Sequence, residues 1–316
     1  MADFVLDVPK KNSNQTMKTL IYTLLLSGFL KSENSPYVVV LGIAQDGGLP
    51  HAGCVEKCCK NSWSTGENEK VSSIGIIDPK TGQSWLIDAT PDFASQLNIL
   101  ENVHNTRLSG IFLTHAHIGH YIGLLQLGRE VMGAKNMPVY VMPKMKAFLK
   151  NNSPWDQLIS IGNIKILSLQ DSKEIKLTRD IYIEPFLVPH RDEFSETVGY
   201  LIVGQSKRAL YVPDIDKWDL WDIDINTLVT QVDYAFIDAT FFEDGEIPRP
   251  MSEVPHPFVE ESITRFKSLA IEEKNKIYFI HLNHTNPARD PFYEGRIAIE
   301  KQGYHFATFG MRFSLE

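Results

Sequence analysis

The sequence predicts an α/β fold in which two β-sheets are covered by helices. Short apolar segments rich in β-branched residues recur along the chain and alternate with helix-like segments, with no linker after Tyr37. Histidine and aspartate residues follow several of these apolar segments, so strand ends would carry the polar chemistry. The chain has 316 residues, 43% of them hydrophobic, and this is ample for a buried core.

Apolar runs give the expected strands, and apolar residues at helical spacing give the expected helices. In chain order the strands cover residues 37–44, 72–77, 85–87, 108–113, 139–142, 164–169, 181–188, 198–203, 209–212, 234–237 and 277–280. The sequence DPKTG at residues 78–82 predicts a hairpin turn between the second and third strands. Helices are expected over residues 122–132 and 258–270. Glu260 and Glu261 lie in the first turn of the latter, where the helix dipole favours acids.

Residues 1–36 are expected to form an extension to a single domain that covers residues 37–316. Residues 19–30 (TLIYTLLLSGFL) are apolar, too few to cross a bilayer, and of the length found in secretory signals. Met17 and Lys18 would form the basic start of such a signal, so residues 17–35 are interpreted as signal-peptide-like and favour export to the periplasm. The alternative is a short helix docked on the domain of a cytoplasmic protein.

Composition excludes several functional classes. The chain has 31 Lys and Arg residues against 39 Asp and Glu residues, a formal net charge of −8, and no basic cluster, which argues against long nucleic acids as partners. Three cysteines are an odd number and too few for a disulfide scaffold, so a metal site or buried thiols are favoured. We expect a small-molecule substrate and no integral membrane span, and we leave a homodimer open.

The segment THAHIGH, residues 114–120, predicts a metal site. It follows the apolar strand 108–113, and side chains two positions apart in an extended segment point the same way, so His115 and His117 can bind one ion. His120 comes where the chain turns into the next helix and can face the same cavity. Neutral imidazole suits zinc, and also iron or nickel.

This motif resembles the HxHxDH signature of the metallo-β-lactamase fold superfamily, whose fold is a four-layer αβ/βα sandwich. The resemblance extends to later residues that end predicted strands. It implies a first metal site formed by His115, His117 and His190. It also implies a second metal site formed by His120 and His281, with Asp214 as the carboxylate that bridges the two sites.

One position departs from the superfamily pattern. The acid that precedes the last histidine of the motif is Gly119 here, so the second site has either a vacancy or a substitute such as Asp46 or Asp88. Fewer anionic ligands weaken binding of a hard dication, and the second metal is therefore expected to be loose or absent.

Across residues 37–315 the order of motifs resembles the pyrroloquinoline quinone biosynthesis protein B subfamily. The matching pieces include QDGG at residues 45–48, ATPD at 89–92 and HLNHTNP at 281–287. That subfamily typically lacks the histidines found here at 115 and 117 and keeps the acid that Gly119 replaces. The resemblance implies, as one alternative, iron-dependent oxidation or cofactor maturation with Fe²⁺ at the three-histidine site.

The chain also shares features with the cyclic phosphodiesterase of phosphonate breakdown. That enzyme has a cysteine-rich loop that holds a structural zinc, together with a histidine three residues after the last catalytic histidine. The corresponding residues here are Cys54, Cys58, Cys59 and His284, and Cys₃His is a closed tetrahedral zinc set. The alternative is that the thiols are simply buried or free.

Asp238-Ala239-Thr240 resembles the Glu-Ala-Thr of tRNA 3′-processing nucleases, where the acid pairs with a downstream histidine that shuttles protons. His256 is the matching histidine, and an imidazole oriented by an acid is a suitable general acid for a leaving alkoxide. The alternative is a loop histidine and a buried structural acid.

Three functions therefore remain after the sequence analysis. The first is a zinc-dependent hydrolase in which metal-bound hydroxide, oriented by Asp214, attacks a small ester, lactone, β-lactam or cyclic phosphodiester and His256 protonates the leaving group. This reading expects one or two Zn²⁺ ions in the active site, with Fe²⁺ or Mn²⁺ as substitutes, and one structural Zn²⁺. The second is the iron-dependent oxidation or cofactor maturation named above. The third is a non-catalytic metal-binding carrier protein.

Overall fold

The computed structural model describes residues 34–316. The apolar run at residues 19–30, and with it most of the proposed signal segment, lies outside the described residues. Within residues 34–316, no helix is both long enough and apolar enough to cross a membrane.

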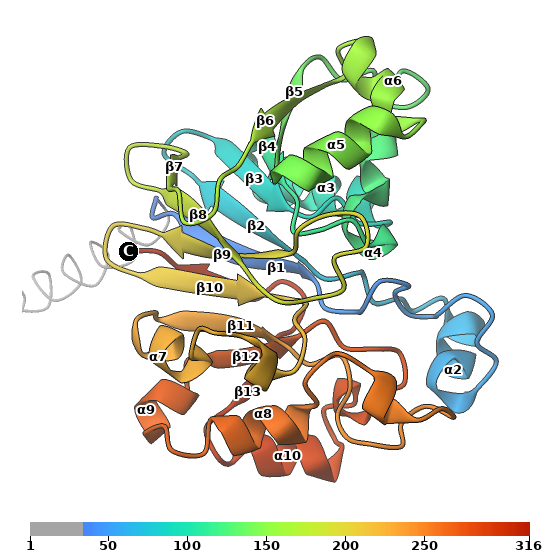
Figure 1. The fold of residues 1–316 in the computed structure, drawn as a ribbon, viewed down its shortest axis with the longest axis vertical. Coiled ribbons are helices and arrows are strands. Elements are labelled where there is room, and N and C mark those ends of the chain that lie inside the picture. Colours follow the sequence, from blue (N-terminus) through green and yellow to red (C-terminus); the bar gives the residue numbers. More distant parts are fainter. Residues whose placement is uncertain (1–33) are drawn as a thin grey trace, which may run out of the picture.

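Two mixed seven-stranded sheets form the centre of the molecule (Figure 1). The first has the order β14 (Arg312–Ser314), β1 (Tyr37–Gly42), β2 (Ser73–Asp78), β3 (Gln83–Ile87), β4 (Arg107–Phe112), β5 (Met137–Val141), β6 (Ile164–Ser168). The second has the order β13 (His305–Phe306), β12 (Ile277–Ile280), β11 (Tyr234–Asp238), β10 (Arg208–Val212), β9 (Val198–Val203), β8 (Tyr182–Leu187), β7 (Ile175–Lys176). Strands β3 to β6 are parallel, as are β10 to β13, and the other pairs are antiparallel.

Helices cover the outer face of each sheet, which gives the predicted four-layer sandwich (Figure 1). Those on the first sheet are α3 (Phe93–Asn98), α4 (Ile118–Tyr121), α5 (Pro143–Asn151) and α6 (Trp155–Ser160). Those on the second are α7 (Ile225–Thr230), α8 (Val259–Arg265), α9 (Ile271–Lys274) and α10 (Glu294–Glu300). Helix α2 (Lys57–Thr65) stands apart at one edge of the molecule. Short segments of 3₁₀ or π helix occur at Ile99–Val103, Ile122–Leu127, Trp218–Leu220, Met251–Glu253 and Pro287–Arg289.

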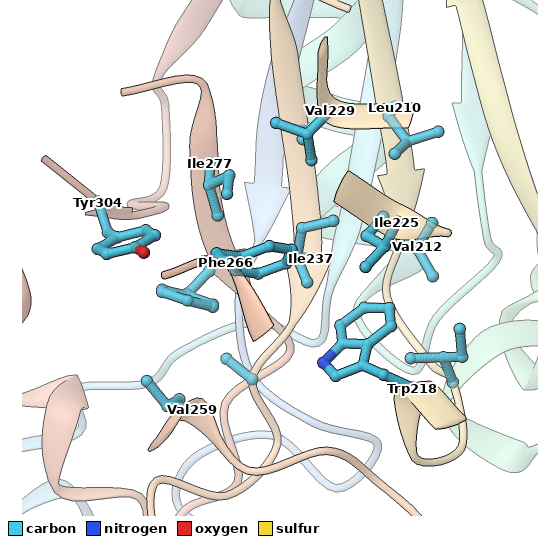
Figure 2. Close-up of a cluster of buried hydrophobic side chains, with 14 of the residues drawn as sticks. Leu210, Val212, Trp218, Ile225, Val229, Ile237, Val259, Phe266, Ile277 and Tyr304 are labelled. Carbon is cyan, nitrogen blue, oxygen red and sulfur yellow. The ribbon is translucent and has the colours of Figure 1, made fainter. Parts of the chain in front are cut away.

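The strand sequences are apolar on both faces because both faces are buried. In β1, Val38 and Val40 enter the core between the sheets, while Val39 and Leu41 pack toward the helices of the first sheet. In β10, Leu210 and Val212 join the cluster between the second sheet and its helices (Figure 2). The residues that alternate with them along the strand face the other sheet. This double burial explains why simple apolar runs located the strands.

The two helices expected from periodicity are shorter than predicted. The first ends after the 3₁₀ turn Ile122–Leu127, because the next residue, Gly128, adopts an extended conformation with φ −63° and ψ 165°. The second, α8, ends at Arg265. The amide of Phe266 bonds to carbonyls of the preceding turn, the chain changes direction, and the Phe266 ring becomes completely buried in the core under the second sheet.

Candidate metal centre

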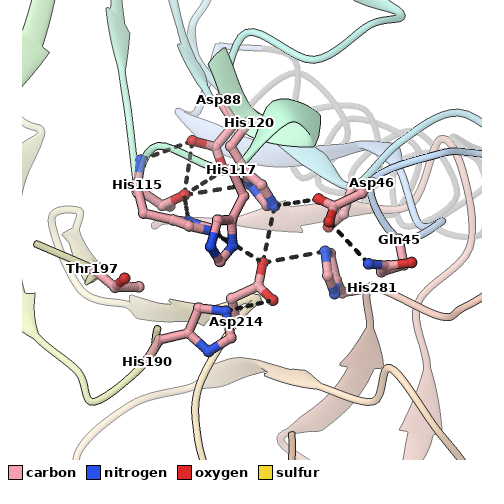
Figure 3. A network of polar contacts seen from close by, with 12 residues as sticks. Gln45, Asp46, Asp88, His115, His117, His120, His190, Thr197, Asp214 and His281 are labelled. Carbon is pink, nitrogen blue, oxygen red and sulfur yellow. Dashed lines mark hydrogen bonds and ion pairs between the residues drawn. The ribbon is translucent and has the colours of Figure 1, made fainter. Parts of the chain in front are cut away.

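Polar side chains that follow strands of both sheets meet at one edge of the sandwich (Figure 3). Strand β4 leads to His115, β8 to His190, β10 to Asp214 and β12 to His281, while the loop after β1 carries Asp46. Strands that run in the same direction end at the same edge of a sheet, so residues far apart in the sequence become neighbours. All six active-site ligands expected from the sequence lie in this group: His115, His117, His120, His190, Asp214 and His281.

Three imidazoles form the first potential site. One ring nitrogen from each of His115, His117 and His190 lies within 4.8 Å of those of the other two. Nε2 of His115 is 2.7 Å from Nδ1 of His117, and the ring of His190 lies 5.4 Å and 5.1 Å from the rings of the same two residues. The three nitrogens are thus close enough together to bind one cation.

A second potential site lies beside the first, with Asp214 between them. Oδ2 of Asp214 is 2.9 Å from Nε2 of His120, 3.2 Å from Nε2 of His281 and 3.8 Å from Nε2 of His115. Its Oδ1 is 3.7 Å from Nε2 of His190. The carboxylate therefore has one oxygen near ligands of each group, as a bridging residue requires.

The two acids that the sequence offered as substitutes for the missing ligand take different places. Oδ1 of Asp46 is 3.2 Å from Nε2 of His120, on the side of the ring that faces Asp214 and His281. Asp88 instead contacts the opposite nitrogen, Nδ1 of His120, at 2.7 Å. Asp88 is thus wrong as a substitute ligand, because its carboxylate is used to orient the ring of His120.

The chemistry of the unsatisfied atoms fits a metal. Buried polar atoms normally have hydrogen-bond partners, and leaving one without costs about 1–3 kcal/mol. Among the described residues, five buried atoms of this centre have no hydrogen-bond partner: Oδ1 of Asp46, Oδ2 of Asp214 and Nε2 of His120, His190 and His281. All five are lone-pair donors that metals bind, and their convergence supports metal binding here.

Each of the five imidazoles is oriented through its other nitrogen. The partners are Thr114 for His115 at 2.9 Å, Glu193 for His117 at 3.2 Å, Asp88 for His120 at 2.7 Å, Asp216 for His190 at 3.0 Å and Thr240 for His281 at 2.9 Å. Such outer contacts fix the tautomer and ring orientation of metal-ligating histidines. The orienting roles of Thr114, Glu193, Asp216 and Thr240 were not predicted from the sequence. Thr114 and Thr240 lie within motifs quoted for their neighbours, and Asp216 lies two residues after an expected ligand, but no motif marks Glu193.

Burial lowers the pKa of His115, His117 and His281, and these rings are therefore neutral with a lone pair available. At His120 burial also lowers the pKa, but the carboxylates of Asp88, Asp214 and Asp46 outweigh it and hold that pKa well above its usual value. Burial raises the pKa of Asp214, but the nearby His281 and His120 outweigh it and hold that pKa well below its usual range. Asp214 therefore remains a carboxylate.

Asp238 and His256 form a buried pair next to the centre. Oδ2 of Asp238 is 2.7 Å from Nδ1 of His256, and the same nitrogen is 3.6 Å from Oδ1 of Asp214. Burial alone would lower the pKa of His256, but the Asp238 carboxylate raises it above its ordinary value. The acid and histidine expected from the nuclease resemblance are thus in contact, at a position that borders the three-histidine group.

The three cysteines and His284 form a separate cluster. Ligand atoms of Cys54, Cys58, Cys59 and His284 lie within 4.8 Å of one another. Nδ1 of His284 is 3.5 Å from Sγ of both Cys58 and Cys59, and Sγ of Cys54 is 3.6 Å from that of Cys58. Adjacent Cys58 and Cys59, in the first turn of α2, therefore both face His284. Burial and the neighbouring His51 and Arg289 lower the pKa of His284 to about 4, so its ring is neutral.

Comparisons with known proteins agree with this geometry. Residues 84–282 match the family described as the beta-lactamase superfamily domain. Among curated proteins, Coenzyme PQQ synthesis protein B of Methylorubrum extorquens (strain PA1) is 24% identical over 308 residues, which cover 88% of this chain and 100% of the relative. The protein of the same name from Xanthomonas campestris pv. campestris (strain B100) is 23% identical and covers 88% and 99%.

Two solved structures share the fold. The crystal structure of Zn²⁺-bound PqqB from Methylobacterium extorquens has a TM-score of 0.73 at 21% identity and covers 88% of this chain and 100% of its own. A diphosphatase from the PhnP family has a TM-score of 0.62 at 22% identity, with coverages of 89% and 98%. The similarities to protein B and to the phosphonate-pathway phosphodiesterase are therefore confirmed. The chain belongs to the β-lactamase superfamily and has the metallo-β-lactamase fold.

Proposed function

We propose that the chain is a metal-dependent hydrolase of a small ester, lactone, β-lactam or cyclic phosphodiester. The observation that carries the proposal is the convergence of five buried, unpartnered ligand atoms at one strand edge. In this proposal the first Zn²⁺ binds to His115, His117 and His190, and Asp214 bridges to a second ion held by His120 and His281. A structural Zn²⁺ binds to Cys54, Cys58, Cys59 and His284.

Residues of the chain supply the proton transfers. When bound, zinc supplies Lewis-acid polarisation of the substrate oxygen and acidifies water. The Asp214 carboxylate, kept ionised by His281 and His120, accepts a hydrogen bond from the attacking water and orients it. Asp238 accepts a hydrogen bond from Nδ1 of His256 and raises the pKa of that ring, so in the doubly protonated imidazolium Nε2 also carries a proton, which a leaving alkoxide receives.

The proposal is tested with His117→Ala and a panel of phosphodiesters, lactones and β-lactams. His117 contributes one of the three nitrogens of the first site. Its loss should therefore remove the metal ion of that site and abolish hydrolysis. A matched control is His104→Ala, because His104 contacts Tyr37 and lies outside the centre. Equal hydrolysis by wild type and His117→Ala would refute the proposal, and absence of hydrolysis in a metal-loaded wild type would favour the carrier function.

A second candidate function rests on the curated relatives. The similarity to Coenzyme PQQ synthesis protein B covers 88% of this chain. This similarity favours iron-dependent oxidation or cofactor maturation with Fe²⁺ at the three-histidine site. Elemental analysis of protein purified without added metal, combined with oxygen uptake, separates the two. Zinc with hydrolysis supports the hydrolase. Iron with substrate-dependent oxygen uptake supports the alternative, and the same analysis detects Mn²⁺.

We also propose that residues 37–316 act as one domain and that residues 17–35 direct export to the periplasm. N-terminal sequencing of the protein from a periplasmic extract tests this, since export with cleavage predicts a start shortly before Tyr37. An intact N-terminus in the cytoplasmic fraction would contradict it. We also propose that the chain can form a homodimer, and the mass of the purified protein measured by analytical sedimentation tests this.

A further inference from the structure

We infer that Asp46 is the carboxylate ligand of the second metal ion, in place of the superfamily acid that Gly119 replaces, and that Asp46 requires glycine at position 119. The inference rests on the proposed metal centre and concerns how its second site is completed. It reverses the expectation that this site is weak, because the missing carboxylate is supplied by a loop distant in the sequence.

The Asp46 carboxylate points one oxygen into the second site. One oxygen of Asp46 belongs to a group with the ring nitrogens of His120 and His281 in which all ligand atoms lie within 4.8 Å of one another, and Oδ1 is the oxygen that lies 3.2 Å from Nε2 of His120. This Oδ1 and both Nε2 atoms are buried and lack a hydrogen-bond partner within the described part of the chain. His120 and His281 are completely buried, so no solvent satisfies these nitrogens. The carboxylate of Asp46 and the ring of His120 therefore approach each other closely at this site.

The other oxygen of Asp46 is held away from the site. Oδ2 accepts a hydrogen bond of 2.9 Å from Nε2 of Gln45. The backbone of this loop is fixed as well, because the amide of Gln45 donates to the carbonyl of Leu282, next to His281, at 2.9 Å. Ala44 also forms isolated bridges to Val71 and Leu282. Asp46 is therefore placed in register with His281 by the backbone, as a preorganised ligand requires.

Gly119 leaves the space that Asp46 occupies. A Cβ atom at position 119 would lie 2.2 Å from Oδ1, 2.5 Å from Cα and 2.9 Å from Cγ of Asp46. Two of these atoms belong to the carboxylate, and the third is backbone that cannot rotate away. An acid at position 119 and Asp46 in its present place thus exclude each other, and the absence of the superfamily acid coincides with a carboxylate in the same space.

With Asp46 the second site has two histidines and two carboxylates, Asp46 and Asp214. Mixed imidazole and carboxylate sets of four are ordinary for zinc. We therefore expect wild type to bind two Zn²⁺ ions at this centre in addition to one at the cysteine cluster. Removal of the Asp46 charge should release one ion and leave the other two.

The test measures zinc per chain and zinc affinity in Asp46→Asn and Gly119→Ala. Asp46→Asn keeps the size of the side chain and removes its charge. Gly119→Ala leaves Asp46 intact but adds the Cβ that its carboxylate and backbone cannot accommodate. Asp219→Asn is the matched control, because that side chain is 92% exposed and pairs with Arg265 away from the centre. Zinc is counted by elemental analysis after dialysis, and affinity is measured by competition with a chromophoric chelator.

Both variants should lose about one zinc per chain, with affinity at the second site reduced at least about tenfold, while Asp219→Asn matches wild type. Wild-type stoichiometry and affinity in Asp46→Asn would overturn the inference, whether or not Gly119→Ala folds. Wild type with only one ion at this centre would also overturn it, yet would leave the proposed function intact. Metal content unchanged in His117→Ala would instead refute the proposed function.

Discussion

Asp88→Asn is a sharp test of how the protein orients its metal ligands. Asp88 is completely buried and has φ 68°, a left-handed conformation that asparagine tolerates well, so this substitution isolates the effect of charge. Its Oδ1 accepts hydrogen bonds from the amide and hydroxyl of Thr114, at 2.8 and 3.0 Å. Its Oδ2 accepts from Nδ1 of His120 at 2.7 Å.

The magnitude follows from these contacts. In Asp88→Asn the amide oxygen must stay opposite the Thr114 amide, which can only donate, so the NH₂ group faces Nδ1 of His120. His120 must then move its proton to Nε2, the nitrogen that lies 2.9 Å from Asp214 and lacks a hydrogen bond. A protonated Nε2 has no lone pair for a metal. Loss of such an outer contact typically costs about 10- to 100-fold in metal affinity, or about 1.4–2.7 kcal/mol.

Chelator competition measures the affinity, and thermal unfolding without metal measures stability. Asp78→Asn is the control, because Asp78 is also buried, at 3% exposure, but accepts a hydrogen bond from Lys80 in the hairpin turn between β2 and β3. That control should bind metal as wild type does. If Asp88→Asn binds the second ion within about twofold of wild type, Asp88 does not set the tautomer of His120 and the reasoning fails.

Three further predictions concern other parts of the structure. Cys58→Ser should lose one zinc per chain and melt at a lower temperature, since Sγ of Cys58 contacts both Cys54 and His284; an unchanged zinc count would contradict the structural site. His256→Gln should slow hydrolysis of alkyl substrates by about 10²–10⁴-fold, yet have little effect on nitrophenyl analogues, whose leaving group needs no proton. Equal losses on both would exclude the general-acid role. Burial raises the pKa of Glu246 from 4.5 to about 7, despite its hydrogen bonds from the Phe242 amide and the Thr285 hydroxyl. Because the folded state holds this proton more tightly, the stability contribution is full below pH 4.5 and is lost as the pH rises through 7. Glu246→Gln should therefore melt higher than wild type at pH 8 and not at pH 4, and a parallel pH dependence of the two melting temperatures would contradict this.

The histidine cluster was predictable because its geometry is local. His115 and His117 are two positions apart, and Nε2 of the first lies 2.7 Å from Nδ1 of the second, as expected for side chains that point the same way. Asp214 and His281 were predictable through the superfamily resemblance, and the structure brings them together because each follows one of the strands that run the same way and end at the same edge of the sheet. The strands themselves were located well because double burial makes them continuously apolar.

The features of the site that were not predicted depend on contacts between segments that are distant in the sequence. Nothing in the sequence distinguishes Asp46 from Asp88 as the substitute ligand, because the choice depends on how closely the loop after β1 approaches α4. Glu193 orients His117 from a loop with no recognisable motif, and Thr240 orients His281 although its motif was quoted only for the neighbouring Asp238. Short helices such as α5 and α6 were also missed, since nine and six residues give little periodicity.

The most direct test of the central claim is the metal content of wild type beside His117→Ala. If the rings of residues 115, 117 and 190 share a cation, wild type holds more metal than its cysteine cluster can bind, and His117→Ala loses at least one ion per chain while it keeps the cysteine-bound zinc. Equal metal content in the two proteins, with the variant folded, would contradict the shared site and remove the basis for metal-dependent hydrolysis.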